Sequence, residues 1–251
     1  ISNCDVGSVT VKLSDEGTYH ITVGCTDMGT GCDTIIAQFA ADVLETPIDN
    51  ISVYGVDTDI SPYDSGSYAS STTYLTGMAA VKACEQLRER IIALAAVRMN
   101  KDASALTFDG ENVIDESDGA KMSLFDIATA SMCNNEISLE VTYSHSSPVS
   151  PPPFMAACAE IEADPETGAI ELLDYTACVD CGTVVNTNLA RVQTEGGLLQ
   201  GIGMTLYEDI WYDERGKNLS NSFMQYKVPS RLDTDRIRVE FDSSYEPTGP
   251  F

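Results

Sequence analysis

The sequence Thr18-Tyr-His-Ile-Thr-Val-Gly-Cys-Thr-Asp-Met-Gly-Thr-Gly31 joins two kinds of pattern. Apolar and polar residues alternate in its first half, and they alternate again in residues 9–13, which predicts the two strands of a β-hairpin. Over residues 35–44 apolar residues recur at helical spacing, which predicts a helix that opens at about Asp33. The glycines and hydroxyls of the intervening loop therefore stand where a strand gives way to a helix.

Two further loops combine small and hydroxyl residues in the same way. Residues 64–73 (DSGSYASSTT) precede a helical pattern over 71–99, and residues 179–182 with 193–197 accompany a Gly-rich helix expected at about 190–206. N–H groups at a helix N-terminus attract phosphate, glycine lets backbone approach a ligand, and hydroxyls add donors. The same residue types also form ordinary turns and caps. Three such loops together favour a large anionic cofactor held by neutral donors.

Familiar nucleotide-binding and nucleophile motifs do not explain these loops. The sequence contains neither GxxxxGK[ST] nor a GxGxxG that opens a βαβ unit, which disfavours a P-loop nucleotide triphosphatase and a Rossmann dehydrogenase. It also lacks GxSxG, and neither His20 nor His145 has a suggestive neighbour. Cys178 and Cys181 form a single CxxC, for which a structural role, a zinc site and redox chemistry are alternative interpretations.

The rest of the chain predicts an α+β fold in two α/β subdomains. Alternating runs predict further strands at residues 51–54, 137–143, 154–163, 170–178 and 236–241. Ser123 is expected to cap a short helix. The segment HSSPVSPPP at residues 145–153 predicts a linker, because proline cannot donate to a β-ladder. We therefore expect one subdomain over residues 1–146 and a second, with the Gly-rich helix, over 147–251.

The charge balance limits the classes of partner. The chain of 251 residues has a formal net charge of −25, which repels phosphate backbones and anionic lipid surfaces. Nucleic acid and membrane binding are therefore excluded as main functions. No run approaches the ~20 apolar residues that a bilayer span needs, and the first twenty residues lack the pattern of a signal peptide. A cytoplasmic location is expected.

Five segments in chain order carry a family resemblance. They are residues 24–38 (GCTDMGTGCDTIIAQ), 67–77 (SYASSTTYLTG), 153–168 (PFMAACAEIEADPETG), 179–203 (VDCGTVVNTNLARVQTEGGLLQGIG), and the end of the chain with YKVP at 226–229 and EPTGPF at 246–251. Each segment resembles a motif of the molybdenum hydroxylases, the xanthine dehydrogenase/aldehyde oxidase family. The ordered set resembles the C-terminal cofactor-binding part of the molybdenum-containing chain of such enzymes.

The resemblance implies a molybdopterin cofactor with molybdenum, in the form often extended as the cytosine dinucleotide. The family's cofactor-binding positions correspond to Gly29, Thr30, Gly31, Ser67, Ala69, Ser70, Thr72 and Gln193. The first three would face the pterin and its phosphate, the serines and Thr72 would bond the phosphates or the nucleotide, and Gln193 would bond the pterin. Tyr68 and Ala69 correspond to positions that touch the substrate. No residue of the chain corresponds to a metal ligand.

The resemblance also implies an oxidoreductase that works as part of a larger complex. Enzymes of this family hydroxylate an electron-poor carbon with oxygen from water, so the substrate would be a purine- or nicotinate-like heteroaromatic or an aldehyde. Iron–sulfur clusters and FAD would lie on partner chains or domains, and the other half of the molybdenum domain would be a further partner. The catalytic glutamate is expected beyond Phe251, where the second subdomain would be truncated. The chain alone should therefore not turn over.

A second hypothesis from another class is a binding module or remnant that keeps the fold without the reaction. Thr30 stands where the family commonly has Gln, Ser71 where it often has Arg, and Thr187 where it usually has Pro. Molybdenum in the purified complex would discriminate between the two hypotheses.

Overall fold

The structure is a computed structural model that describes residues 3–134, 138–233 and 236–251. The chain folds as two compact units, Ile1–Ser150 with Pro247–Phe251, and Pro151–Glu246. The expected division had placed residues 247–251 in the second part, but they pack with the first unit. The reason is that the Phe251 ring stacks on Phe39 at a centroid distance of 5.1 Å.

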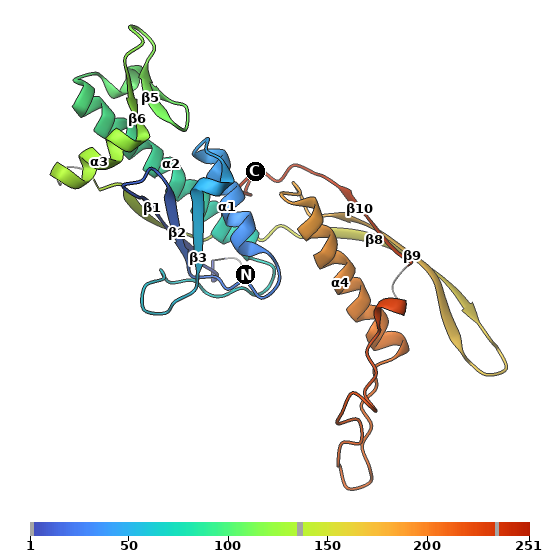
Figure 1. The fold of residues 1–251 in the computed structure, drawn as a ribbon. Helices are drawn as coiled ribbons and strands as arrows, with labels where there is room; N and C mark the ends of the chain where they lie inside the picture. Colours follow the sequence, from blue (N-terminus) through green and yellow to red (C-terminus); the bar gives the residue numbers. More distant parts are fainter. Residues whose placement is uncertain (1–2, 135–137, 234–235) are drawn as a thin grey trace. The chain divides into compact units, whose positions relative to one another are not determined.

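A four-stranded sheet with the order β3-β2-β1-β7 forms the centre of the first unit (Figure 1). Its strands are β1 (Gly7–Leu13), β2 (Tyr19–Val23), β3 (Ile51–Gly55) and β7 (Glu140–His145). The predicted hairpin is confirmed, because β1 pairs antiparallel with β2. The strand β3 lies parallel to β2, since helix α1 (Cys32–Val43) carries the chain back between them. The expected strand start at Ile137 lies outside the described residues.

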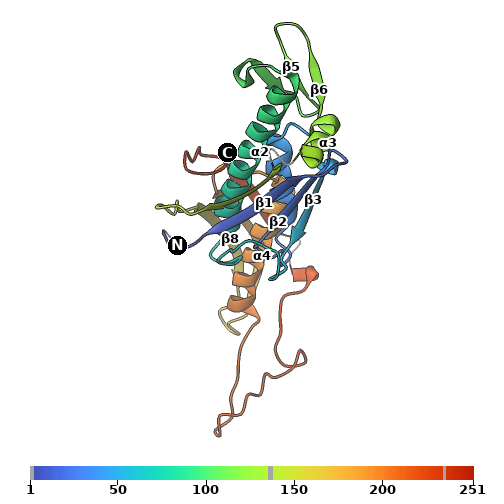
Figure 2. The same cartoon turned by 90° about the vertical axis from the view of Figure 1, so that its left-hand side faces the viewer.

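One face of this sheet carries the core. Alternate residues of β1 and β2 are at most 5% exposed: Val9, Val11, Leu13, Tyr19, Ile21 and Val23. The helices α1 and α2 (Thr72–Met99) cover this face, and α2 runs along the sheet in the second view (Figure 2). The residues between them, such as Thr10 and His20, point to the opposite face because successive side chains of a strand alternate. The period-2 pattern thus fixes which side the helices cover.

A glycine in α2 lets the two helices approach closely. A Cβ atom at Gly77 would lie 2.5 Å from Cε2 of Phe39 in α1. Phe39 is 1% exposed, and its ring also stacks on Phe251. The aromatic side chain therefore has no room to move away, and glycine is the residue that fits.

The remainder of the first unit is a small sheet and a short helix. The strands β4 (Leu106–Phe108), β5 (Asn112–Asp115) and β6 (Lys121–Ser123) form a sheet in that order, followed by α3 (Leu124–Asn134). The Ser123 hydroxyl accepts the Asp126 N–H at 3.1 Å, which confirms the expected cap. Strands of three or four residues carry too little alternation to predict from sequence. Single-turn 3-10 helices lie at η1 (Ile48–Asn50) and η2 (Ala103–Ala105).

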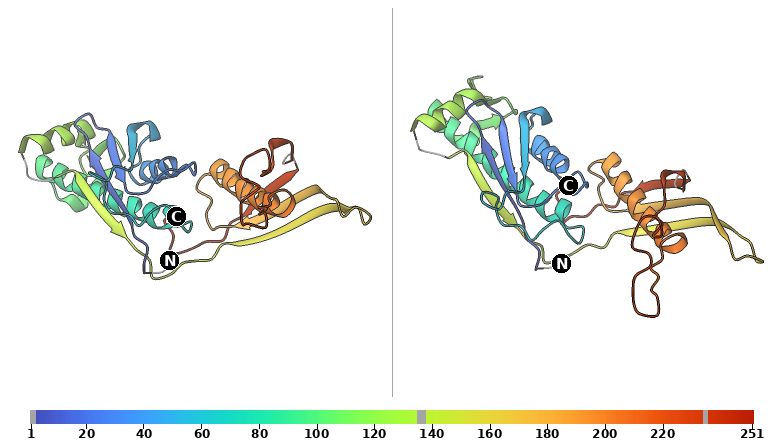
Figure 3. Two further views of the ribbon diagram at one scale, coloured as in Figure 1. Left: turned by 90° about the horizontal axis from the view of Figure 1, so that it is seen from below. Right: turned by 60° about the horizontal axis from the view of Figure 1, so that its bottom comes forward.

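The second unit is a three-stranded sheet with one helix. Its elements are β8 (Phe154–Ala163), β9 (Ile170–Asp180), α4 (Thr187–Leu206), η3 (Arg231–Asp233) and β10 (Ile237–Asp242). β8 and β9 form a long antiparallel hairpin, visible in both views of Figure 3, and β10 lies parallel to β9. Among the described residues of this unit, only Ala177, Leu198 and Ile202 are buried apolar side chains. Every residue of β8 is exposed.

Within the described part of the chain, no helix is both long and apolar enough to cross a membrane.

Two glycine-to-alanine changes in helices should have opposite effects. Gly77→Ala should destabilise the first unit by about 1–3 kcal/mol, because the added methyl overpacks Phe39. Gly196→Ala should stabilise α4 by about 0.5–1 kcal/mol, since a Cβ there meets no described atom within 4 Å. Scanning calorimetry of the full-length protein would measure both. Equal stability of the two variants would contradict this account of the packing.

Candidate functional site

The first two predicted loops lie side by side in the first unit. One follows β2 and leads into α1, and the other follows β3 and leads into α2. Because β2 and β3 are parallel neighbours, both loops leave from the carboxyl end of the sheet, where α/β proteins commonly bind ligands. Ser67 fastens them together: its hydroxyl oxygen accepts the Thr26 N–H at 2.9 Å and donates to the Thr26 carbonyl at 2.9 Å.

The N-terminal end of α1 is filled by a carboxylate of its own loop. Asp27 Oδ1 accepts the backbone N–H groups of Gly29 at 2.9 Å and Gly31 at 3.1 Å. Partial burial works to raise the pKa of Asp27, but the amides of Gly29, Gly31, Asp33 and Thr30 outweigh it and hold that pKa below its ordinary value. These amides therefore already have an anion as partner.

The N-terminal end of α2 is open by comparison. Its N-cap residue, Ser71, makes no side-chain capping hydrogen bond to the helix, and the first turn contains no acidic residue. The Ser71 hydroxyl instead donates to the Tyr68 carbonyl at 2.9 Å. The Leu75 N–H already donates to the Ser71 carbonyl at 2.8 Å. The N–H groups of Thr72, Thr73 and Tyr74 make no hydrogen bond to a described residue, and they lie at the positive end of the dipole of this 28-residue helix.

The turn before α2 is shaped for an anion. Ala69 and Ser70 both have left-handed backbones, with φ of 53° and 57°, and Ser71 returns to the right-handed region. Successive left- and right-handed residues turn their N–H groups toward one side and form a concave anion site. The hydroxyls of Ser70 and Thr72 make no hydrogen bond to any residue in the described part of the chain. The Ser71 N–H donates to the Tyr68 carbonyl at 3.2 Å, so the two hydroxyls and the remaining amides of the turn are the donors left for a ligand.

Tyr68 is held by the N-terminal segment. Its hydroxyl donates to Asp5 Oδ1 at 2.5 Å, and Asp5 is only 2% exposed. The same hydrogen bond raises the pKa of Tyr68, since the neighbouring carboxylate opposes a second negative charge. The tyrosine ring is 45% exposed, so it presents a face to solvent next to the α2 turn.

The base of the first loop gathers thiols and carboxylates. Cys25 directly follows the loop's first glycine and is fully buried, and Cys32 opens α1 at 6% exposed. The Cys32 thiol donates to Asp33 Oδ1 at 3.7 Å. Burial, followed by the charge of Asp27, raises the pKa of Asp33.

The third predicted loop is partly wrong. Residues 193–197 lie inside α4 rather than in a loop before it, because Asn186 caps the helix earlier, accepting the Leu189 N–H at 3.1 Å. Gln193 is exposed on this helix, in the second unit. A Cβ at Gly196, Gly197 or Gly201 would meet no described atom within 4 Å, so nothing in the described chain requires these glycines.

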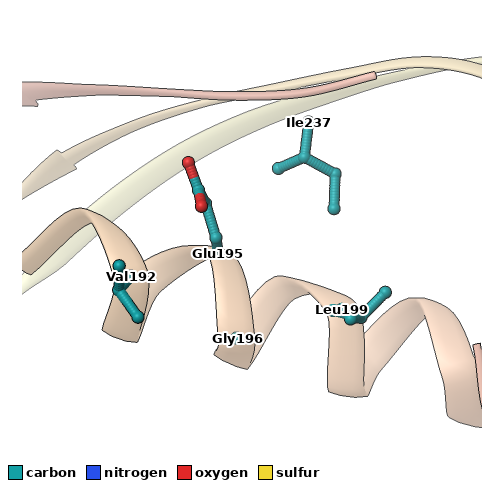
Figure 4. Close-up of a pocket in the computed structure, with 5 residues that line it drawn as sticks. All are labelled: Val192, Glu195, Gly196, Leu199 and Ile237. Carbon is teal, nitrogen blue, oxygen red and sulfur yellow. The ribbon is translucent and has the colours of Figure 1, made fainter. Parts of the chain in front are cut away.

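Beside this glycine-rich stretch, α4 leaves a pocket of about 230 Å³ against β10. Val192, Glu195 and Leu199 line it from the helix, and Ile237 lines it from the strand (Figure 4). The Glu195 carboxylate points toward the strands in this view. A gap of this kind between a helix and its own sheet indicates that α4 is loosely seated on β10.

The structure joins the loop that carries Gly29, Thr30 and Gly31 to residues 67–72 through the contact of Thr26 with Ser67. It places Gln193 in the other compact unit. Sequence reasoning missed Asp27 and Asp5 as partners of these loops. A signal existed for Asp27, since an aspartate before glycines commonly accepts backbone N–H groups a few residues on. Nothing local pointed to Asp5, 63 residues before its partner. Cys178 and Cys181 are exposed free thiols and belong to no three-ligand cluster among the described residues.

A glycine loop and an open helix end at the carboxyl edge of a sheet suit a protein that binds a large phosphorylated cofactor. The model of the molybdopterin cofactor-binding domain family matches residues 2–235, and the chain belongs to this family. The predicted family and fold class are confirmed.

By their names, the relatives of this chain are redox enzymes or subunits of redox enzymes. The chain is 34% identical over 253 residues to the probable hypoxanthine oxidase XdhD of Escherichia coli (strain K12), covering 100% of this chain and 26% of that protein. It is 30% identical to the nicotine 6-hydroxylase large subunit of Paenarthrobacter nicotinovorans, covering 89% and 28%. The chain therefore spans about a quarter to a third of the curated relatives it matches.

Solved structures agree with the fold. The quinoline 2-oxidoreductase of Pseudomonas putida 86 superposes with a TM-score of 0.87 at 27% identity, over 98% of this chain and 32% of that one. The CO dehydrogenase of Oligotropha carboxidovorans also gives a TM-score of 0.87, at 26% identity, over 97% and 31%. The chain is thus a molybdopterin-binding domain of the xanthine dehydrogenase and CO dehydrogenase kind.

The Ser67 contact should matter for the stability of the loop pair. Ser67→Ala removes both hydrogen bonds to Thr26 and should destabilise the first unit by about 1–2 kcal/mol. Ser70→Ala is the matched control, because its hydroxyl has no described partner, and should change stability by less than about 0.5 kcal/mol. Thermal unfolding of the full-length variants measures both. An equal loss of stability in the two variants would contradict the conclusion that Ser67 holds the two loops together.

Proposed function

We propose that this chain is the cofactor-binding part of a molybdenum hydroxylase, and that the open N-terminus of α2 holds a phosphate of the molybdopterin. The observation that carries the proposal is the contrast between the two helix ends. Asp27 occupies the amides at α1, whereas α2 has neither a side-chain cap nor an acidic residue in its first turn. A phosphate therefore meets repulsion at the first end and unpaired donors at the second.

The residues present fit the cofactor. The first-turn amides of α2 with the hydroxyls of Ser70 and Thr72 would bond phosphate oxygens, and the left-handed turn at Ala69 aims these donors. The backbone of Gly29 and Gly31 gives the pterin a flat, side-chain-free approach.

Ser67 and Thr30 would act differently from the other cofactor-binding positions of the family. Ser67 positions the two loops, because its hydroxyl donor is already engaged with Thr26. Thr30 is too short to reach as far as the usual glutamine, so its hydroxyl would bond the pterin through a water. Gln193 would bond the pterin, as the family resemblance implies.

The overall charge of −25 does not oppose this binding. Helix dipoles and N–H groups act at contact range, whereas charges beyond about 8–10 Å are screened by salt. The described first turn of α2 is free of acidic side chains. We infer the cytosine dinucleotide form of the cofactor from the family resemblance alone, and the hydroxyls of Ser70 and Thr72 with the α2 amides would bond its phosphates.

When bound, the molybdenum cofactor supplies the oxidation of an electron-poor carbon with oxygen derived from water. The chain's own residues bind and orient it. Tyr68, fixed by Asp5, and Ala69 would line the substrate side of the α2 turn. The names of the two relatives above, a hypoxanthine oxidase and a nicotine hydroxylase, favour a nitrogen heteroaromatic over an aldehyde as substrate.

Further parts of the enzyme are required. Large apolar side chains of the second unit are exposed, including Phe154 (68%), Phe223 (83%) and Leu232 (91%), which is more than an isolated soluble domain normally shows. The chain spans about a quarter of the hypoxanthine oxidase relative. We propose that the rest of the molybdenum domain covers these side chains, and that iron–sulfur and FAD centres lie on partner chains or domains.

A charge at the α2 end tests the proposal. Thr72→Asp should leave the unfolding temperature unchanged or slightly raised, since a carboxylate in the first turn stabilises a helix by about 0.3–1 kcal/mol. It should nevertheless strip most molybdenum and pterin from the full-length enzyme, because the carboxylate repels the phosphate.

Thr107→Asp on β4 is the matched control with the same charge change, and it should keep the cofactor. Metal analysis and pterin release from anaerobically purified enzyme give the readout. Full molybdenum content in Thr72→Asp would refute the phosphate site. Absence of molybdenum and pterin from the wild-type enzyme would support the non-catalytic remnant instead.

A further inference from the structure

Four side chains that could ligate a metal meet at the base of the first loop. One ligand atom each from Asp27, Cys32 and Asp33 lies within 4.8 Å of the other two. Cys25, fully buried, is hydrogen-bonded through its side chain to Cys32. Neither the cofactor site nor the fold requires this combination of thiols and carboxylates.

Local structure holds three of these groups in place. Two hydrogen bonds from the loop amides fix the Asp27 carboxylate, and a carboxylate has lone pairs left for a further partner. Cys32 is the first residue of α1, next to the left-handed N-cap Gly31. The Asp33 carboxylate packs on the backbone of Gly55, since a Cβ there would lie 3.1 Å from Oδ1. The donors are therefore positioned before any ion arrives.

The cluster has no counter-charge of its own. No ion pair between described residues involves Asp27 or Asp33. Asp27 is exposed and Asp33 is half-buried, and a ligand oxygen of one lies within 4.8 Å of a ligand oxygen of the other, so the two negative charges repel each other. A bound cation would offset the repulsion between the two carboxylates. Asp27 already accepts the amide of Gly31 at the positive end of α1.

We propose that Asp27, Cys32 and Asp33 bind a zinc ion, with water as the fourth ligand. One thiolate and two carboxylates suit this borderline cation, which takes sulfur at about 2.3 Å and carboxylate oxygen at about 2.0–2.2 Å in tetrahedral geometry. Magnesium and calcium prefer oxygen alone.

Binding releases the Cys32 proton to solvent, since the ligand is the thiolate. Cys25 is hydrogen-bonded through its side chain to Cys32, and this contact orients that ligand. The ion would join the first turn of α1 to the loop that carries Gly29, Thr30 and Gly31. The two proposals share Asp27, but they are tested by separate readouts, the zinc content for this site and the molybdenum content for the cofactor site.

The experiment counts zinc and molybdenum in the same samples of full-length enzyme, purified anaerobically, dialysed against a chelator and resupplied with zinc. Cys32→Ala and Asp33→Asn should each contain one zinc per chain fewer than wild type, with affinity weakened by more than ~10-fold. Cys84→Ala, which removes another buried thiol, should keep the full zinc content. Molybdenum content reports separately on the cofactor.

A second measurement does not depend on variants that fold. Zinc should slow the alkylation of Cys32 by a maleimide in the wild-type enzyme, followed by peptide mass spectrometry, and should leave the rate at Cys158 unchanged. X-ray absorption should find one sulfur and the rest oxygen around zinc. Unprotected Cys32, unchanged zinc content in Cys32→Ala, or rapid Cys25–Cys32 disulfide formation with diamide despite added zinc would each overturn the site.

Discussion

The hydrogen bonds from Gly29 and Gly31 to Asp27 fill the N-terminal end of α1 with a negative charge that belongs to the chain. Everything else about the candidate site follows from this occupancy. An incoming phosphate is directed away from α1, whose amides are taken. It is directed toward α2, whose first turn has neither cap nor acid. The glycine loop is then left as a neutral surface for an uncharged ring system.

The sheet topology allows the N-terminal ends of α1 and α2 to have these different roles at one site. Since β2 and β3 run parallel, both helices begin at the same edge, and the contact of Ser67 with Thr26 holds their loops together. The core enforces the arrangement, because α1 and α2 approach closely only where Gly77 leaves room for Phe39. Packing in the interior and ligand geometry at the edge are therefore linked through the same two helices.

Elements with a long periodic pattern could be predicted from the sequence, whereas contacts between residues far apart in the sequence could not. Alternation and helical spacing predicted β1, β2, α1 and α2 correctly, because buried faces impose a period. The short strands β4 to β6 carried no such period. The site loops could be found from their glycines and hydroxyls. The sequence could not predict which donors are left without a partner, because that depends on where Ser67 and Asp27 make their hydrogen bonds. The end of the chain was assigned to the wrong unit because Phe251 stacks on Phe39, which lies 212 positions earlier in the sequence. No local pattern reports a contact between residues so far apart.

A cryo-electron microscopy map of the intact enzyme purified with its cofactor tests the central claim most directly. The account predicts a phosphate whose oxygens lie about 2.7–3.2 Å from the first-turn N–H groups of α2 and from the hydroxyls of Ser70 and Thr72. Asp27 should still accept the amides of Gly29 and Gly31. A phosphate seated on those amides, with the Asp27 carboxylate displaced, would contradict the account.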